Sequence, residues 1–406
     1  MVKSIKKKYL DYASGARANA SSVHSFGVEA KKSLAKARRE VADILRAQSE
    51  EIIFTSGGTE SNNLAIQGVV LNFWEQNLKK IPHIITTNIE HPSVLETFKA
   101  LEKRKLAEIS VVGVESNGVL DPKKIKKEIR KNTILISVMY ANNEIGTVQP
   151  IREIAKEIKH YKKAEKFSKE NFSALSFPYF HTDAVQASNY LDLNVEKLGV
   201  DMLSLSGSKI ESAGLPPARA GGAQAGRVGV LLKKRSVALS SVYYGGDQEM
   251  GLRPGTENLA EILKFAEAFK NTQDEKFKSK EVKRLTKLRD YFIKKLLENS
   301  FNEFSPIVNG DLKERLPNNV NVTFPKIPSE LLVIELSERG IMCSSKSACK
   351  SKEKGGSYVI RAIRGDANPE IGGVRFSFGR DTKKEDLDYT LKSLKTILQK
   401  LKKWYS

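Results

Sequence analysis

Cysteine is scarce in this chain of 406 residues, which contains two, Cys343 and Cys349. A secreted protein held together by disulfides normally has more, so the count favours a reducing compartment, and we expect the protein in the cytoplasm. The sequence has no cysteine and histidine spacing typical of a zinc site, and we expect no bound metal.

Long apolar runs are also missing. No uninterrupted stretch is long enough to span a membrane, and residues 1–10 are lysine-rich without the apolar centre of a signal peptide. Hydrophobic residues make up 40% of the chain and charged residues 29%, which is typical of a globular protein. The length predicts a large core and two structural domains, with no membrane partner.

Acidic residues are too few to balance the basic ones: 68 Lys and Arg face 48 Asp and Glu, a formal net charge of +20. Such a surface can attract tRNA, DNA or other anions. Because the chain has no RNP-like aromatic motif, we favour solvated lysine-rich helix faces over nucleic acid as an obligate partner.

Short apolar segments alternate with helical patterns from about residue 51, which predicts an α/β fold with a mostly parallel sheet covered by helices on both faces. The expected strands are residues 51–55, 83–88, 108–114, 133–141, 179–183 and 202–206, and the clearest helices are residues 62–77, 122–131 and 151–161. After residue 258 the pattern changes to a long Lys/Glu-rich helix to about 299, strands at 318–324 and 373–378, and a final helix from 384, which predicts a smaller α+β domain. Residues 162–177 and 211–227 read as insertions.

Lys209 follows the apolar run 200–205 and the polar residues Ser206, Gly207 and Ser208. Ligands of open α/β sheets gather at the carboxyl ends of strands. A partly desolvated lysine there favours its neutral amine and can form a Schiff base, while the preceding hydroxyls can hold a phosphate. Many lysines simply follow strands, so the hypothesis depends on the other strand ends.

Two of those strand ends carry groups that suit a flat, phosphorylated cofactor. Gly58 and Thr59 follow a strand and open a helix, so they are candidates for a phosphate cradle, although an ordinary capped helix start explains them equally well. His91 can stack on a ring and move protons near neutral pH, although a lone loop histidine more often has no special role.

Polar groups at three further positions suit the ring and a carboxylate. Asp183 ends an apolar strand, where a protonated pyridine nitrogen would balance its charge, and Gln186 can reach a phenolic oxygen. The amides of residues 142–143 can bind a ring oxygen or a carboxylate, and the guanidinium of Arg375 suits an amino-acid carboxylate. The plain alternatives are a helix-capping aspartate, a strand-ending turn and a surface salt bridge.

Two loops complete the set of candidates. Residues 340–350 are small and polar, and nearby lysines favour thiolate at Cys349, whereas Cys343 stands among apolar neighbours and is expected to be partly buried. Residues 244–258 suit a loop that crosses to a partner subunit, with Thr256 as a phosphate ligand. An incidental cysteine and a plain surface loop are the alternatives.

Together these segments resemble the cysteine desulfurases of the NifS/IscS type, in the class-V aminotransferase family. The matching motifs occur in the family's order over nearly the whole chain: Tyr9-Leu-Asp-Tyr-Ala-Ser, Thr55-Ser-Gly-Gly-Thr-Glu-Ser-Asn-Asn, Glu90-His, Asn142-Asn-Glu-Ile-Gly-Thr-Val-Gln-Pro, His181-Thr-Asp-Ala-Val-Gln-Ala, Ser204-Leu-Ser-Gly-Ser-Lys, Gly255-Thr-Glu-Asn, Ser345-Lys-Ser-Ala-Cys and Val374-Arg-Phe-Ser-Phe-Gly-Arg.

The resemblance implies a homodimeric enzyme of the pyridoxal 5′-phosphate (PLP) transferase fold type I, with a seven-stranded sheet. It implies a large domain at residues 15–260 and a small one made of residues 1–14 and 261–406. The reaction would take sulfur from L-cysteine, release L-alanine and leave a persulfide for iron–sulfur cluster assembly or tRNA thiolation. The resemblance implies that Lys209 attaches the cofactor and transfers protons, that His91 stacks on its ring, and that Asp183 and Gln186 contact the ring. The cofactor phosphate would be bound by Thr59, by Ser206 and by the partner subunit's Thr256. Asn143 and Arg375 would bind the substrate carboxylate, and Cys349 would accept the sulfur.

The chain departs from the family at three places. Ser208 stands where the family usually has histidine, the usual Tyr-Gly-Pro-Lys-Gly after the lysine is absent, and Asp247 replaces a glycine. We expect Ser208 to hold phosphate, with weaker cofactor binding. A selenocysteine lyase and a non-catalytic paralogue that serves as a binding or scaffold protein remain the alternative interpretations.

Overall fold

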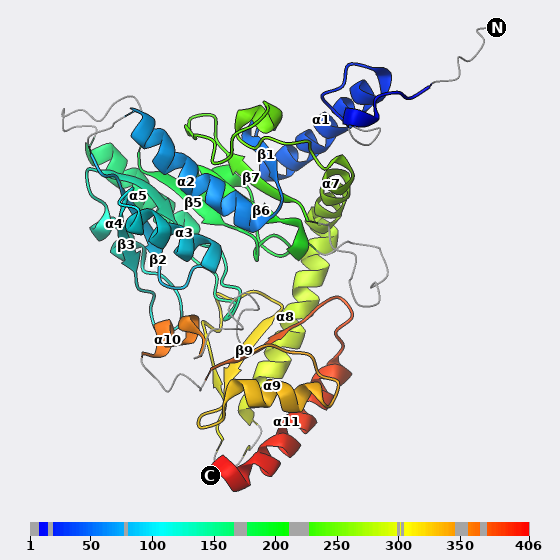
Figure 1. Ribbon diagram of the computed structural model, residues 1–406. Helices are drawn as coiled ribbons and strands as arrows, with labels where there is room; N and C mark the ends of the chain where they lie inside the picture. The colour runs from blue at the N-terminus through cyan, green and yellow to red at the C-terminus, as the bar shows by residue number, and fades with distance from the viewer. Residues whose placement is uncertain are drawn as a thin grey trace.

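The computed structural model describes residues 8–14, 19–76, 80–165, 177–210, 227–298, 301, 304–345, 356–365 and 372–405. They form two parts, one around a large sheet and one around a small sheet, joined by the long helix α8 (Glu275–Glu298) (Figure 1). Within these ranges no helix is both long enough and apolar enough to cross a bilayer.

The large sheet has seven strands in the order β1-β7-β6-β5-β4-β2-β3. Every neighbouring pair is parallel except those involving β7, which runs against both β6 and β1, so the predicted mostly parallel sheet is confirmed. The strands are β1 (Ile52–Thr55), β2 (His83–Thr87), β3 (Glu108–Val112), β4 (Thr133–Ser137), β5 (Tyr179–Asp183), β6 (Met202–Ser206) and β7 (Gly229–Lys233).

Alternate side chains of each strand enter two separate cores. On β1, Ile52 and Phe54 pack in one core and Ile53 in the other. Burial on both faces explains why the strands read as continuous apolar runs. One face is covered by α2 (Gly58–Gln76) and α3 (Pro92–Lys103); the other is covered by α1 (Ser25–Leu45), α4 (Pro122–Glu128), α5 (Ile151–Glu165), α6 (Val195–Leu198) and α7 (Leu259–Gln273).

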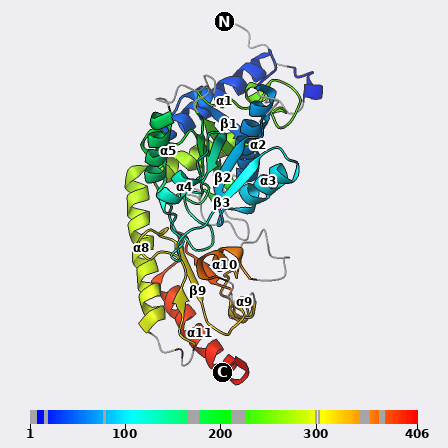
Figure 2. The same ribbon diagram turned by 90° about the vertical axis from the view of Figure 1, so that its left-hand side faces the viewer.

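The smaller part is built on an antiparallel sheet in the order β10-β9-β8. Phe292 of α8 packs edge-on against Phe376 and Phe378, with ring centroids 5.3 and 5.8 Å apart, so α8 belongs to the core of this part as well. Its elements are β8 (Ile307–Val308), β9 (Asn319–Thr323), β10 (Val374–Ser377), α9 (Ser329–Ser337), α10 (Tyr358–Arg364) and α11 (Lys384–Tyr405) (Figure 2).

The structure differs from the sequence-based expectations in several elements, and the short strand β8 was not predicted. Strand β7 was not predicted; it follows the insertion 211–227 and pairs with β6 and with β1, which lies far away in the chain. The single long helix expected after residue 258 is divided into α7 and α8 at Asp274, whose carboxylate accepts a hydrogen bond from the backbone N–H of Phe277 and so starts the second helix.

Residues 8–14, which were expected to belong to the small domain, lie beside α1 (Figure 1). The ring of Tyr9 packs edge-on against those of His24 and Phe26, with ring centroids 5.6 and 6.0 Å apart. This contact lies beside α1, at the end of the molecule opposite the C-terminus (Figure 1). Helix α7 also packs along α1. We therefore propose that the boundary between the two parts lies near Asp274, with residues 8–14 beside the large sheet.

Candidate active site

Ten of the predicted site residues line one cavity of about 270 Å³. Strand ends of the large sheet supply most of its wall, and Arg375 reaches it from β10 of the smaller part, so the cavity lies between the two parts. Its lining consists of Gly58, Thr59, Asn62, His91, Ser93, Met139, Asn143, Asp183, Val185, Gln186, Ser206, Ser208, Lys209 and Arg375.

Lys209 ends a 3₁₀ turn, Gly207–Lys209, that follows β6. Its backbone carbonyl accepts a hydrogen bond from Asn189 Nδ2 at 2.6 Å, which fixes the backbone where the lysine enters the cavity. The side chain is exposed in the single chain, so the expected partial desolvation is not provided by the residues around it.

The start of α2 lies against the end of β6 in an arrangement that suits an anion. A Cβ added to Gly58 would lie 2.8 Å from Val185 Cγ2 and 3.3 Å from Ser206 Cβ, so only glycine lets the backbone come this close to β6. The hydroxyl oxygens of Ser206 and Ser208 lie 3.0 Å apart beside it. Free N–H groups and hydroxyls at the N-terminus of a long helix suit a phosphate.

Asp183 lies in the cavity wall with 6% of its surface exposed. Its Oδ2 accepts a hydrogen bond from Asn62 Nδ2 at 2.7 Å and its Oδ1 accepts one from the Val185 N–H at 3.0 Å. Both donors are neutral and leave the negative charge unbalanced, which favours a cationic ligand atom beside the carboxylate.

His91 caps the N-terminus of α3, where its Nδ1 accepts a hydrogen bond from the Ser93 N–H at 3.1 Å. Burial lowers the pKa of His91; the charge of Lys209 acts in the same direction and that of Asp183 opposes it. The imidazole therefore enters the cavity as a neutral ring at physiological pH, which suits stacking on a flat cofactor.

The opposite wall carries two unsatisfied polar atoms. Arg375 Nη1 donates to the backbone carbonyl of Asn143 at 2.9 Å, while Arg375 Nε and Asn143 Oδ1 are buried without a hydrogen-bond partner among the described residues. Burial also lowers the pKa of the Arg375 guanidinium. An unpaired buried donor is costly, so this end of the cavity is suited to a carboxylate ligand.

Two predicted site residues, Thr256 and Cys349, are not among the described residues that line this cavity, and neither is the second cysteine, Cys343. Thr256 lines a separate hollow with Glu60, Tyr244 and Arg253. Cys343 is half-buried as expected, and burial raises the pKa of its thiol to about 11, which keeps it protonated. Cys349, the predicted sulfur acceptor, lies outside the described residues.

Sequence reasoning missed Asn62 and Ser93. Asn62 Nδ2 donates to Ser93 Oγ at 2.9 Å as well as to Asp183. One local signal existed, because Asn62 is one helical turn beyond Gly58 and so lies on the same side of α2 as the cradle.

PLP fits the residues present. The cradle at Gly58, Ser206 and Ser208 suits its phosphate, and Asp183 suits its ring nitrogen. The unsatisfied atoms of Asn143 and Arg375 suit an amino-acid substrate beside it.

Comparisons with known proteins agree with this geometry. The family model described as aminotransferase class-V matches residues 1–390. The chain is 40% identical to a cysteine desulfurase IscS of Dictyoglomus turgidum over 95% of this chain and 88% of that protein. It is 38% identical to a cysteine desulfurase IscS of Methanosarcina thermophila, over 98% and 90% respectively.

A solved NifS-like protein superimposes on the chain with a TM-score of 0.78 at 32% identity, covering 96% of this chain and 94% of the other. This likeness confirms the predicted PLP-dependent fold type I, with its seven-stranded sheet. The chain therefore belongs to the class-V aminotransferase family, among its NifS/IscS-like cysteine desulfurases.

Proposed function

We propose that this protein is a PLP-dependent cysteine desulfurase that converts L-cysteine to L-alanine and places the sulfur on Cys349 as a persulfide. The observation that carries the proposal is that one cavity is lined both by the Asp183 carboxylate, whose hydrogen-bond donors are neutral, and by the Arg375 guanidinium, whose Nε is buried without a partner among the described residues. A cationic ring nitrogen suits the first and an amino-acid carboxylate the second. Family membership supports the same assignment.

The roles follow from where the side chains lie. Bound PLP supplies an electron sink for the bond broken at the substrate's α-carbon. Arg375 and Asn143 hold the substrate carboxylate, and Asp183 keeps the ring nitrogen protonated. The Lys209 amine attaches the cofactor and, when free, moves the α-proton; Gln186 and the cradle residues orient the ring.

Sulfur transfer falls to Cys349 rather than Cys343. The Cys349 thiolate attacks the substrate sulfur, the substrate carbon–sulfur bond breaks, and its electron pair stays on carbon and is protonated to give alanine. Cys343, with a thiol pKa of about 11, is protonated at neutral pH and a poor nucleophile.

The test is sulfide release from L-cysteine with a thiol reductant, measured beside the visible spectrum of the PLP-loaded protein. Cys349→Ala should keep the cofactor band and lose sulfide release by a factor of about 100 or more, the loss expected for a catalytic nucleophile. Cys343→Ala is the matched control and should keep both. Sulfide release that survives Cys349→Ala, or a wild-type protein that stays colourless with PLP, overturns the proposal.

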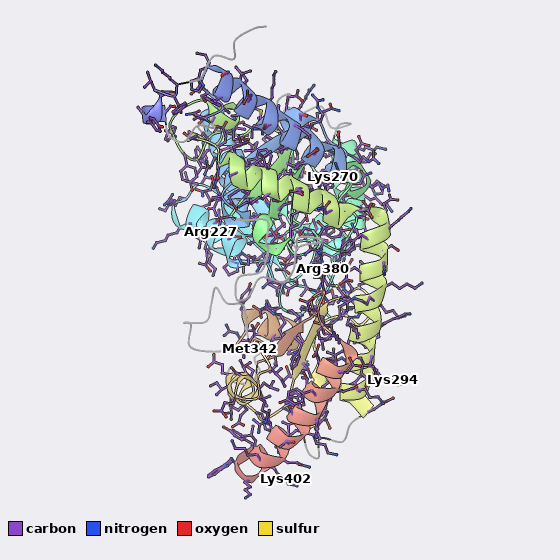
Figure 3. All side chains as sticks on the ribbon, turned by 90° about the vertical axis from the view of Figure 1, so that its right-hand side faces the viewer. Arg227, Lys270, Lys294, Met342, Arg380 and Lys402 are labelled. Atoms are coloured by element: carbon purple, nitrogen blue, oxygen red, sulfur yellow. The ribbon has the colours of Figure 1, made fainter. Side chains whose placement is uncertain are left out.

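Assembly and partners form a second part of the proposal. We infer a cytoplasmic homodimer. The low cysteine count supports the compartment, and exposed apolar side chains near the α1 end, among them Leu10, Val23 and Tyr244, support the dimer. The sulfur acceptor is an iron–sulfur scaffold or a tRNA-thiolation enzyme. The net charge of +20 supports nearby tRNA. Lysines such as Lys294 of α8 and Lys402 of α11 contribute to this charge at the C-terminal end of the molecule (Figure 3).

A further inference from the structure

Asn62 joins Asp183 to Ser93 through its amide nitrogen. The residue is 1% exposed, and its Nδ2 lies 2.7 Å from Asp183 Oδ2 and 2.9 Å from Ser93 Oγ. An ionised carboxylate only accepts hydrogen bonds, so the amide nitrogen rather than the amide oxygen must face it. The two protons of the –NH₂ group are then both used, one toward Asp183 and one toward Ser93.

Ser93 continues this chain of hydrogen bonds to His91. Because its oxygen accepts from Asn62, its own hydroxyl proton is left for His91 Nδ1, which lies 2.8 Å away. The backbone N–H of Ser93 donates to the same ring nitrogen at 3.1 Å. Two donors thus point at Nδ1, so this nitrogen carries a lone pair and the proton of the neutral ring lies on Nε2.

We propose that Asn62 and Ser93 are positioning residues that hold His91 as the neutral Nε2–H tautomer, so that His91 exchanges protons with the cavity through Nε2 alone. A proton on Nδ1 would face both donors of Ser93 and break the cap of α3. The consequence for catalysis rests on the proposed function, whereas the proton positions are a property of the chain by itself.

The charged groups around His91 do not by themselves determine which ring nitrogen carries the proton. The Asp183 carboxylate at the end of β5 favours an imidazolium, and the Lys209 ammonium after β6 disfavours it. Arg375 of β10 lines the same cavity, and Glu96 of α3 and Arg104, which directly follows α3, line a second hollow that His91 also borders. Charges of both signs surround the ring, so the hydrogen bonds at Nδ1 select the tautomer.

The test is nitrogen NMR of protein labelled with ¹⁵N-histidine and free of cofactor. The chain has five histidines, and His91→Gln identifies the signals of His91. In the wild type we expect a non-protonated Nδ1 and a protonated Nε2. Ser93→Ala removes one donor from Nδ1, so the midpoint of imidazolium formation should rise by about 0.5–1 pH unit, and Ser93→Thr should restore it.

Thr97→Ala is the matched control. Thr97 lies one turn further along α3 and donates to Asn63 Oδ1 and the Ser93 carbonyl rather than to His91, so the titration of His91 should stay as in the wild type. A proton found on Nδ1 of the wild type, or a Ser93→Ala protein that titrates like the wild type, overturns the proposal. Neither result depends on sulfide release, so this inference and the proposed function fail separately.

Discussion

Glu90 shows how burial changes the chemistry of a single residue beside the active site. It is 0% exposed, and its Oε1 accepts hydrogen bonds from Thr87 Oγ1 at 2.6 Å and from the Met139 N–H at 2.9 Å. Its Oε2 has no partner among the described residues. Burial raises the pKa of Glu90 to about 8, so a neutral acid precedes His91 at physiological pH.

This raised pKa makes stability depend on pH. Between pH 4.5 and 8 the folded protein keeps a proton on Glu90 that the unfolded chain has released. The free energy of unfolding therefore falls as pH rises through this window, by up to about 1.4 kcal/mol per pH unit. Glu90→Gln cannot ionise and should lose this component of the slope.

Urea unfolding at several pH values checks this prediction. The stability of Glu90→Gln relative to the wild type should increase between pH 4.5 and 8 and then level off. Glu102→Gln, an exposed change on the next helix, is the control and should follow the wild type. Parallel curves for Glu90→Gln and the wild type would mean that Glu90 is ionised in the folded protein.

At the scale of elements, the site depends on how closely α2 approaches β6. Gly58→Ala places a Cβ 2.8 Å from Val185 Cγ2 and pushes the helix start away from Ser206. Overpacking of this kind costs about 1–3 kcal/mol. Because the displaced N–H groups are those of the phosphate cradle, affinity for PLP should fall by about tenfold or more.

Titration of the cofactor-free protein with PLP, followed by absorbance, measures this change. Gly113→Ala is the control: its added Cβ would lie 3.8 Å from Asn88 Nδ2, an ordinary contact, and affinity should be unchanged. Equal affinity in Gly58→Ala and the wild type would show that the start of α2 does not bind the phosphate.

At the scale of the whole molecule, exposed apolar residues concentrate near the α1 end. Leu10, Val23 and Tyr244 are each more than 90% exposed. The ion pair between Arg38 and Glu249, at 2.6 Å, links the segment that follows Tyr244 to α1. Apolar surface of this kind is typical of an interface, and we expect a second copy of the chain to cover it.

Light scattering tests this expectation. The wild type should have twice the chain mass of 45.2 kDa, and the double variant Tyr243→Glu with Tyr244→Glu should shift toward the single mass. Trp404→Glu, at the opposite end and 78% exposed, is the control and should remain dimeric. A monomeric wild type, or a double variant of unchanged mass, contradicts the assignment of this surface.

The sequence by itself determined the class of fold and where most site residues would meet. Buried strands read as apolar runs, and polar groups at their carboxyl ends, such as Asp183 and Lys209, converge because parallel strands end at one edge of a sheet. These features depend on the local pattern of residues and on the order of motifs along the chain, and both are properties of the sequence.

Only the tertiary structure decided how distant segments act on one another. It inserted β7 between β1 and β6, brought Arg375 from the smaller part to Asn143, and aligned Asn62, Ser93 and His91. It also left Lys209 exposed and made Glu90 neutral. Burial and hydrogen-bond partners depend on side chains that lie far apart in the chain and meet only in the folded molecule. They therefore cannot be inferred from the neighbouring sequence.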